Sequence, residues 1–339
     1  MAAPIIHKLH DPAGTSRLRK RAINDSQKRV KKAGNECIKL IQSFLDDNLS
    51  GTRQVNEVRR SESLKQVFIV NRTQYLYEVD VNQMANINQT LRDIVYRWLL
   101  NGNQGLWSAQ WYMNTYLNAA WQSGAGDSLQ SLQNLSSTAV VGQELALAVR
   151  ALDLVSILSM PAYQRPIQLL SSRVFNDMRG LSDGMVKDMQ RILSTSIADG
   201  VSARDAAKRL REKLWPDDKG YLSRALRIAR TEVNGAYAQA YLEFNESMER
   251  DVYADSPFMP RVMHLSALTA TTRHWHASRH GKVFTADEQA IWWSESGNRI
   301  NCLCSVTSVL VDRKTGEVLQ QNLYKKAKEQ GEKYFSTRK

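Results

Sequence analysis

Residues 221–248 read YLSRALRIARTEVNGAYAQAYLEFNESM, and this stretch decides how the rest of the chain can fold. Apolar side chains recur in it every three or four positions, at Leu222, Ala225, Leu226, Ala229, Val233, Ala236 and Ala240. Such spacing places them on one face of an α-helix. The stretch therefore predicts a long helix from about Tyr221 to Met248 that buries one face against neighbouring elements.

The chain before this helix shows helical spacing in several further segments. We expect helices over residues 17–46, 84–100, 127–135, 138–158, 162–179 and 183–199, and a helix that ends at Leu214. Ser202 and Asp205 resemble a capping box at the start of that last helix. Gly124-Ala125-Gly126 is expected to form an internal hinge, and Gly180 and Gly184 are expected to mark joints.

Two stretches of the first hundred residues are less regular. Residues 48–63 are polar and are expected to form a loop or a loose helix. Residues 67–70 and 75–79 fit two short strands around a turn at Asn71-Arg72, and they also fit a helix. The residues alone leave this choice open.

An aromatic stripe lies between these regions and the expected hinge. Its spacings of four and five residues put most of it on one helical face, and its members are Trp107, Trp111, Tyr112, Tyr116 and Trp121. Such a stripe either stacks on a partner or a base, or packs between helices. We favour packing between helices.

The residue pattern changes after Arg250, from helical spacing to the patterns of strands and turns. Apolar and β-branched residues alternate in 261–265 and dominate 302–311, and 314–317 resembles a hairpin turn. We therefore predict a mainly α-helical N-terminal part followed by a small C-terminal α+β module. The expected parts are a basic, largely helical arm (1–65), a helical domain (66–200), the module (201–312) and a basic tail (313–339).

The 339 residues carry a formal net charge of +12, and the excess positive charge lies at the two ends. Residues 1–65 hold 14 basic and 7 acidic side chains, and residues 313–339 hold 8 and 3. Basic arms on a neutral body favour a polyanion or an acidic protein surface as partner.

The first expected helix concentrates this charge on one face, at Arg17, Arg19, Lys20, Arg21, Lys28, Arg29, Lys31 and Lys32. Few aromatic residues lie among them, so the pattern predicts contacts to phosphates of double-stranded DNA without sequence preference. A solvated helix face is the alternative interpretation.

Composition excludes several classes of protein. Hydrophobic residues make up 42% of the chain, yet no apolar run approaches the ~20 residues of a membrane-spanning helix. We therefore expect no membrane anchor, and the first residues do not resemble a secretory signal. Three cysteines, an odd number, argue against a disulfide scaffold and for a reducing compartment such as the cytoplasm.

Residues 200–312 contain an ordered set of motifs. They are Arg230-Thr231-Glu232 on the long helix, Thr272-Arg273-His274-Trp275-His276, Gly281-Lys282-Val283-Phe284 and Asn301-Cys302-Leu303-Cys304. This order resembles the phage head morphogenesis family typified by the Mu F-like minor head proteins. The chain departs from that family's pattern at Thr269, where an acidic residue is common, and at Leu303, where the family has arginine.

The resemblance implies a minor component of a tailed-phage head, placed inside the shell near the portal and assembled in the host cytoplasm. The partners it implies are the portal and/or the major capsid protein. Its role would lie in head morphogenesis, genome packaging or DNA delivery. Two other hypotheses remain: a non-specific DNA-binding protein with a docking module, and a zinc- or thiol-dependent enzyme that acts on nucleic acid.

We interpret the motif residues as structural rather than catalytic, and we expect no cofactor and no enzymatic activity. They are Arg230, Thr231, Glu232, Arg273, His276, Gly281, Lys282, Asn301, Cys302 and Cys304. Charges among apolar neighbours should find each other. We expect Glu232 to pair with Arg230 or Arg273, and His276 to hydrogen-bond the backbone of 301–304.

A zinc site of His276, Cys302 and Cys304 is the alternative for three of these residues. The Cys-x-Cys spacing argues against it. On a strand, alternate side chains share a face but lie ~6–7 Å apart, so both sulfurs could not easily reach one ion. We therefore expect no metal, and two buried thiols instead.

Overall fold

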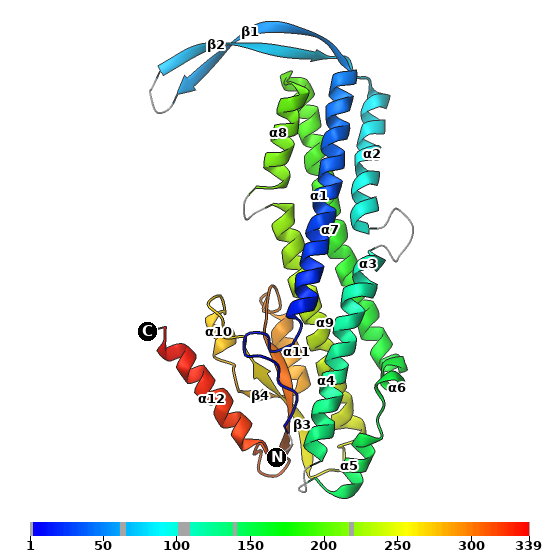
Figure 1. The fold of residues 1–339 in the computed structure, drawn as a ribbon, viewed down its shortest axis with the longest axis vertical. Helices are drawn as coiled ribbons and strands as arrows, with labels where there is room; N and C mark the ends of the chain where they lie inside the picture. The colour runs from blue at the N-terminus through cyan, green and yellow to red at the C-terminus, as the bar shows by residue number, and fades with distance from the viewer. Residues whose placement is uncertain (1–2, 62–65, 101–108, 138–140, 217–219, 339) are drawn as a thin grey trace. The chain divides into compact units, whose positions relative to one another are not determined.

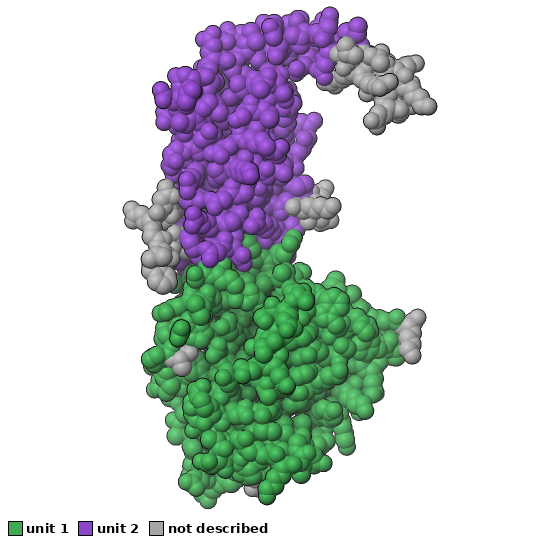
Figure 2. All heavy atoms as spheres, turned by 180° about the vertical axis from the view of Figure 1, so that it is seen from behind, with its two compact units in different colours: residues 1–23, 111–174, 227–339 green, residues 24–110, 175–226 purple. Residues whose placement is uncertain are grey.

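The computed structural model describes residues 3–61, 66–100, 109–137, 141–216 and 220–338. The chain divides into two compact units, each built from separate segments (Figure 2). Unit 1 comprises residues 1–23, 111–174 and 227–339, and unit 2 comprises residues 24–110 and 175–226. The expected class, a mainly helical N-terminal part followed by a small α+β module, is confirmed (Figure 1).

Unit 2 contains helical segments and a hairpin. Its main helical parts come from α1 (Ser16–Asp47), α2 (Val81–Leu100), α7 (Pro161–Asp199) and α8 (Ala203–Leu214), and it also holds the start of the long helix at 221–226. The expected cap of α8 is confirmed, since the Ser202 side chain accepts a hydrogen bond from the backbone N–H of Asp205. The core consists of apolar side chains at helical spacing, such as Val30, Ile38, Leu91 and Leu210.

The hairpin corrects two expectations. Residues expected to form a loop or loose helix make the strand β1 (Leu49–Ser61), which pairs antiparallel with β2 (Gln66–Tyr77). Asn71 and Arg72, expected at a turn, lie within β2. Each strand is long because cross-strand hydrogen bonds satisfy the polar backbone of a stretch whose side chains are mostly exposed.

The base of the hairpin is fixed where α7 ends. Tyr75 donates its N–H to the carbonyl of Gly200, and the hydroxyl of Tyr77 donates to the carbonyl of Val201 at 2.6 Å. Gly200 has φ +63°, and a Cβ there would lie 2.4 Å from Cγ of Gln74. A side chain at this position would therefore separate the hairpin from the helix end.

The expectation of a hinge at residues 124–126 is wrong, because the helical part of unit 1 is continuous there. α3 (Gln110–Tyr112), a π-helical turn (Met113–Leu117) and α4 (Asn118–Ser136) run without interruption, so Gly124 and Gly126 lie inside a helix. α5 (Gln143–Arg150) and α6 (Leu154–Ser159) follow. α7 then continues through the expected joints at Gly180 and Gly184.

The interpretation of the aromatic stripe as packing is confirmed for three of its members. Tyr112, Tyr116 and Trp121 are buried, and Trp111 makes edge contacts to both tyrosine rings. Trp107 lies outside the described residues.

The C-terminal module of unit 1 is built on a three-stranded antiparallel sheet in the order β4-β3-β5. The strands are β3 (Phe258–Leu265), β4 (Val283–Phe284) and β5 (Ser305–Asp312), and α10 (His274–Ala277) and α11 (Ala286–Ser294) lie between them in sequence. The expected long helix is confirmed as α9 (Tyr221–Asp251).

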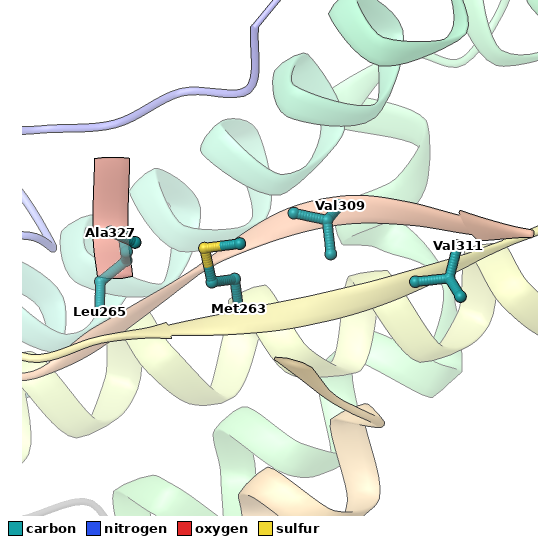
Figure 3. Close-up of a cluster of buried hydrophobic side chains, with 5 residues drawn as sticks. All are labelled: Met263, Leu265, Val309, Val311 and Ala327. Carbon is teal, nitrogen blue, oxygen red and sulfur yellow. The ribbon is translucent and has the colours of Figure 1, made fainter. Parts of the chain in front are cut away.

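Different elements cover the two faces of the sheet. On one face Tyr241 and Asn245 of α9 hydrogen-bond Ser308, and His264 lies against Trp292 and Trp293 of α11. The other face packs against α12 (Gln321–Ser336), whose Ala327 joins a cluster with Met263, Leu265, Val309 and Val311 (Figure 3). The segment expected to be a basic tail therefore contributes to the core of the module.

Among the described residues, no helix is both long enough and apolar enough to span a membrane.

We predict that Gly124→Ala destabilises unit 1. A Cβ at Gly124 would lie 2.1 Å from the carbonyl oxygen of Tyr237, which belongs to the backbone of α9 and cannot rotate away. Overpacking of this kind costs about 1–3 kcal/mol, so the midpoint of thermal unfolding should fall.

Gly126→Ala is the matched control, because it lies on the same helix and its Cβ would meet only Cδ2 of Leu154, at 3.4 Å. The exchange should raise stability by about 0.5–1 kcal/mol through helix propensity. Equal melting temperatures for the two variants would contradict the close approach of α4 and α9.

Candidate functional site

The motif residues of the long helix gather where α9 meets the loop before β5. Glu232 has a side-chain exposure of 1%, and its carboxylate is held by two arginines. Nη2 of Arg173 lies 2.6 Å from Oε2, and Nη2 of Arg299 lies 3.5 Å from Oε1. Glu232 is thus buried and paired as expected, but its partners are Arg173 and Arg299 instead of Arg230 or Arg273.

Two further polar side chains of α9 anchor the same loop. The hydroxyl of Thr231 accepts a hydrogen bond from the backbone N–H of Asn301 at 2.9 Å. Nδ2 of Asn234 donates to the carbonyl of Cys304, also at 2.9 Å. Asn301 has φ +56°, in the left-handed region that asparagine adopts more readily than most residues with a side chain. These contacts hold the loop in that conformation.

Arg273 donates hydrogen bonds to backbone carbonyls of the loop that precedes Asn301. Nη1 donates to the carbonyls of Gly297 and Asn298 at 3.3 and 3.1 Å, and Nη2 donates to the carbonyl of Ile300. Nη1 also lies 3.1 Å from Nε2 of His276. Arg273 is therefore a loop-ordering residue, and its guanidinium makes no contact with Glu232.

His276, Cys302 and Cys304 are buried together, and their ligand atoms all lie within 4.8 Å of one another. Nδ1 of His276 lies 3.4 Å from Sγ of Cys302 and 3.6 Å from Sγ of Cys304. His276 contacts the two sulfurs, whereas we expected it to contact the backbone. The two cysteines precede β5, so the expectation that they lie on a strand is wrong.

The two thiols share one hydrogen bond, which drives their pKa values apart. Donation from Cys302 lowers the pKa of Cys304, and His264 and His276 lower it further. The same hydrogen bond and burial raise the pKa of Cys302.

Gly281 and Lys282 shape the turn between α10 and β4. Gly281 has φ +77°, and its N–H donates to the carbonyl of His264 at 2.9 Å, while the carbonyl of Lys282 accepts from the N–H of His264. A Cβ at Gly281 would lie 3.0 Å from Cβ of Ala327. Both motif residues thus extend the β3–β4 pairing beneath α12.

Two cavities flank the loop before β5 that contains Cys302 and Cys304, which we call the cysteine loop. Cys302 lines both cavities. One, of about 310 Å³, lies between α9 and α11 and is lined by Arg173, Arg299 and the carboxylates Glu243, Glu246 and Asp287. Burial and the neighbouring carboxylates raise the pKa values of Glu243 and Glu246.

The other cavity, of about 220 Å³, is lined by Arg230, Arg273, His276 and both cysteines, and by the threonines of the loop after β3. Arg230, Arg273 and His276 of the motifs therefore face one cavity. Glu232 is not among the residues that line it.

The basic residues of the first helix fall into two groups. Arg17, Lys20, Arg21, Lys28, Lys31 and Lys32 are exposed on α1. Arg19 is buried against Asp11, at 3.0 Å, and Asn234, and Arg29 is half-buried and pairs with Asp25 at 3.3 Å. Arg19 and Arg29 hold the fold, so six of the eight remain available for phosphates.

Several residues of the site were missed by sequence reasoning. Arg173 lies 59 positions before Glu232, and nothing in its local sequence marks it as a partner. Arg299 stands three residues before Cys302, inside the motif region, and could have been considered. His264 was visible as one of four histidines between 264 and 280, and its strand periodicity put it on a defined face.

We predict that Arg173→Ala lowers the stability of unit 1 far more than Arg230→Ala. Removing Arg173 leaves the buried carboxylate of Glu232 with only the longer contact to Arg299, which should cost about 3 kcal/mol. Arg230 makes no contact with Glu232 and faces a cavity, so its removal should cost under about 1 kcal/mol. Thermal melting of the two variants measures the difference, and equal losses would refute this pairing.

The comparisons with known proteins agree with the resemblance of the motifs. Residues 187–307 match the model of the family described as phage Mu protein F like protein. No curated protein and no solved structure matches the chain significantly. The matched segment begins inside α7, includes α8, α9, β3, β4 and the loop with Cys302 and Cys304, and ends within β5. The family suggests a phage head morphogenesis protein and a virion component, and the similarity covers residues 187–307 of the 339.

Proposed function

We propose that this chain is a minor head protein of a tailed phage, acting in head assembly, genome packaging or DNA delivery near the portal. The observation that carries the proposal is the match of residues 187–307 to the phage Mu F-like family. The portal and the major capsid protein are the partners this role requires. The basic face of α1 adds a surface for the packaged DNA.

The role we propose is structural rather than enzymatic. Several polar side chains of the motifs make contacts that hold the fold. Glu232 pairs with two arginines, Arg273 donates to backbone carbonyls, and Thr231 accepts from the N–H of Asn301. A general acid or base needs a free polar atom within reach of a substrate. The residues that define the family instead join α9, the loop and the sheet into one block, as a part of an assembly requires.

Co-expression with the portal and the major capsid protein of the same phage tests the proposal. We expect the chain to co-sediment with the assembled heads at a fixed stoichiometry, and heads made without it to package less DNA. A chain that binds neither the portal nor the capsid protein, and whose loss leaves head yield and DNA content unchanged, would overturn the proposal.

We further propose that the six exposed basic side chains of α1 bind double-stranded DNA without sequence preference. Arg17, Lys20, Arg21, Lys28, Lys31 and Lys32 recur along the helix at spacings that keep them on one side. If each meets one phosphate, the logarithm of the binding constant should fall with the logarithm of salt concentration with a slope near about −5.

A triple variant tests this prediction without removing the core of α1. Replacing Arg17, Lys20 and Arg21 by glutamine should make the slope shallower by about 3 and weaken binding equally on unrelated duplexes. The control replaces Lys325, Lys326 and Lys328, three exposed lysines of α12, and changes the net charge by the same amount. Fluorescence anisotropy over a salt series reports both. Equal slopes for the two variants would show that general charge, rather than α1, binds the DNA.

A further inference from the structure

The cluster of His276, Cys302 and Cys304 has the dimensions of a metal site. In a tetrahedral zinc site with Zn–S bonds near 2.3 Å and Zn–N bonds near 2.0–2.1 Å, a nitrogen and a sulfur ligand lie about 3.6 Å apart. Nδ1 of His276 lies 3.4 Å from one cysteine sulfur and 3.6 Å from the other. Small shifts of the side chains would place all three atoms around one ion.

A fourth donor lies beside this group. His264 is fully buried on β3, and its ring packs against the same Trp292 ring as His276 does, with ring centroids 5.3 and 4.7 Å away. Nδ1 of His264 lies 3.2 Å from Oε1 of Gln289, and that oxygen also accepts from Nη2 of Arg279. Because arginine only donates, the oxygen accepts from both groups, and Nδ1 of His264 carries the ring proton.

The other ring nitrogen of His264 is therefore left with a free lone pair. Nε2 is buried and has no hydrogen-bond partner in the part of the chain that the structure describes. A buried acceptor without a partner is costly unless something binds it. A metal-binding imidazole usually donates its second nitrogen to a carbonyl or carboxylate oxygen, as His264 does to Gln289.

We propose that His264, His276, Cys302 and Cys304 bind one Zn²⁺ ion per chain, as a structural site that ties the cysteine loop to β3 and α10. Two thiolates and two imidazoles are a ligand set that suits zinc. The ion would give the buried Nε2 of His264 the partner that it lacks among the described residues. It goes beyond the proposed head function and does not depend on it.

The contact from Arg273 to His276 determines which ring nitrogen of His276 carries a proton before the ion binds. Arg273 donates to Nε2 of His276, so in the metal-free chain Nδ1 carries a proton that faces the two sulfurs. On binding, that ring proton moves to Nε2, both thiols are deprotonated, and two protons leave for solvent. The contact from Arg273 to His276 gives way, while Arg273 keeps its three backbone carbonyls. Binding should therefore weaken as pH falls.

Zinc content of the full chain, purified without chelator, is the first test. We expect one equivalent per chain by elemental analysis, and a melting temperature that falls with chelator and recovers with zinc. Added to the metal-free chain, Co²⁺ should give the intense visible absorption of tetrahedral cobalt bound to thiolates. A chain without zinc that also gives no such cobalt spectrum would overturn the proposal, as would a Cys302–Cys304 disulfide formed in place of binding.

Variants locate the ion. Cys304→Ser and His264→Ala should each lose the cobalt spectrum, whereas Cys37→Ser and His274→Ala should keep it. Cys37 is a buried thiol of unit 2, and His274 is an exposed neighbour of His276 on α10. Zinc that stays stoichiometric in Cys304→Ser, or is lost in Cys37→Ser, would place the ion elsewhere and overturn this assignment.

Gln289→Leu provides a variant that keeps all four ligands. It removes the oxygen that orients His264, so zinc affinity should fall about 10- to 100-fold while binding stays stoichiometric. Competition with a chromophoric chelator measures the affinity. Unchanged affinity in a folded variant would exclude His264 from the site. The outcome is independent of head assembly, because each readout uses the isolated chain.

Discussion

Burying Glu232 is the constraint on which unit 1 depends. A carboxylate that loses its water must be paired, because an isolated buried charge costs far more than the marginal stability of a domain. Arg173 on α7 and Arg299 in the loop supply that pairing from segments far apart in sequence. The ion pairs therefore fix which part of α7 lies against α9 and where the loop starts.

The remaining polar contacts of α9 follow from that alignment. Once the loop is held at Arg299, Thr231 meets the N–H of Asn301 and Asn234 meets the carbonyl of Cys304. Thr231, Glu232 and Asn234 span one turn of α9. Each contacts a polar group of the loop: an N–H, the guanidinium of Arg299 and a carbonyl. The contact to the carbonyl of Cys304 fixes the end of the loop at which Cys302 and Cys304 meet His276.

Periodicity predicted the helices well, because it reports burial on one face, and that pattern is local. It found α1, α2, α8 and α9 close to their observed bounds. It failed where a residue's role depends on a distant neighbour. Gly124 looks like a hinge by itself, but it is a contact point inside α4 that lets the backbone of α9 approach. The polar strand β1 was missed because its partner strand, rather than a buried face, stabilises it.

The Cys-x-Cys motif illustrates the same limit at the candidate site. The spacing argument was sound for a strand, but β5 begins only at Ser305, and the loop before it lets both sulfurs turn toward His276. The anchors that set this loop, Thr231, Asn234 and Arg273, were partly visible as motif residues, but their targets are backbone atoms that carry no sequence signature.

The distribution of charge in unit 1 separates its possible tasks. Arg273 and Arg299 are turned inward, Arg273 onto backbone carbonyls and Arg299 onto the carboxylate of Glu232. The exposed cations of α1 lie outside the matched segment. The charged motif residues Glu232 and Arg273 thus make internal contacts, whereas six cations of α1 stay exposed. The two regions are nevertheless coupled, because Arg19 of α1 donates to Oδ1 of Asn234, and the same amide donates through Nδ2 to the carbonyl of Cys304.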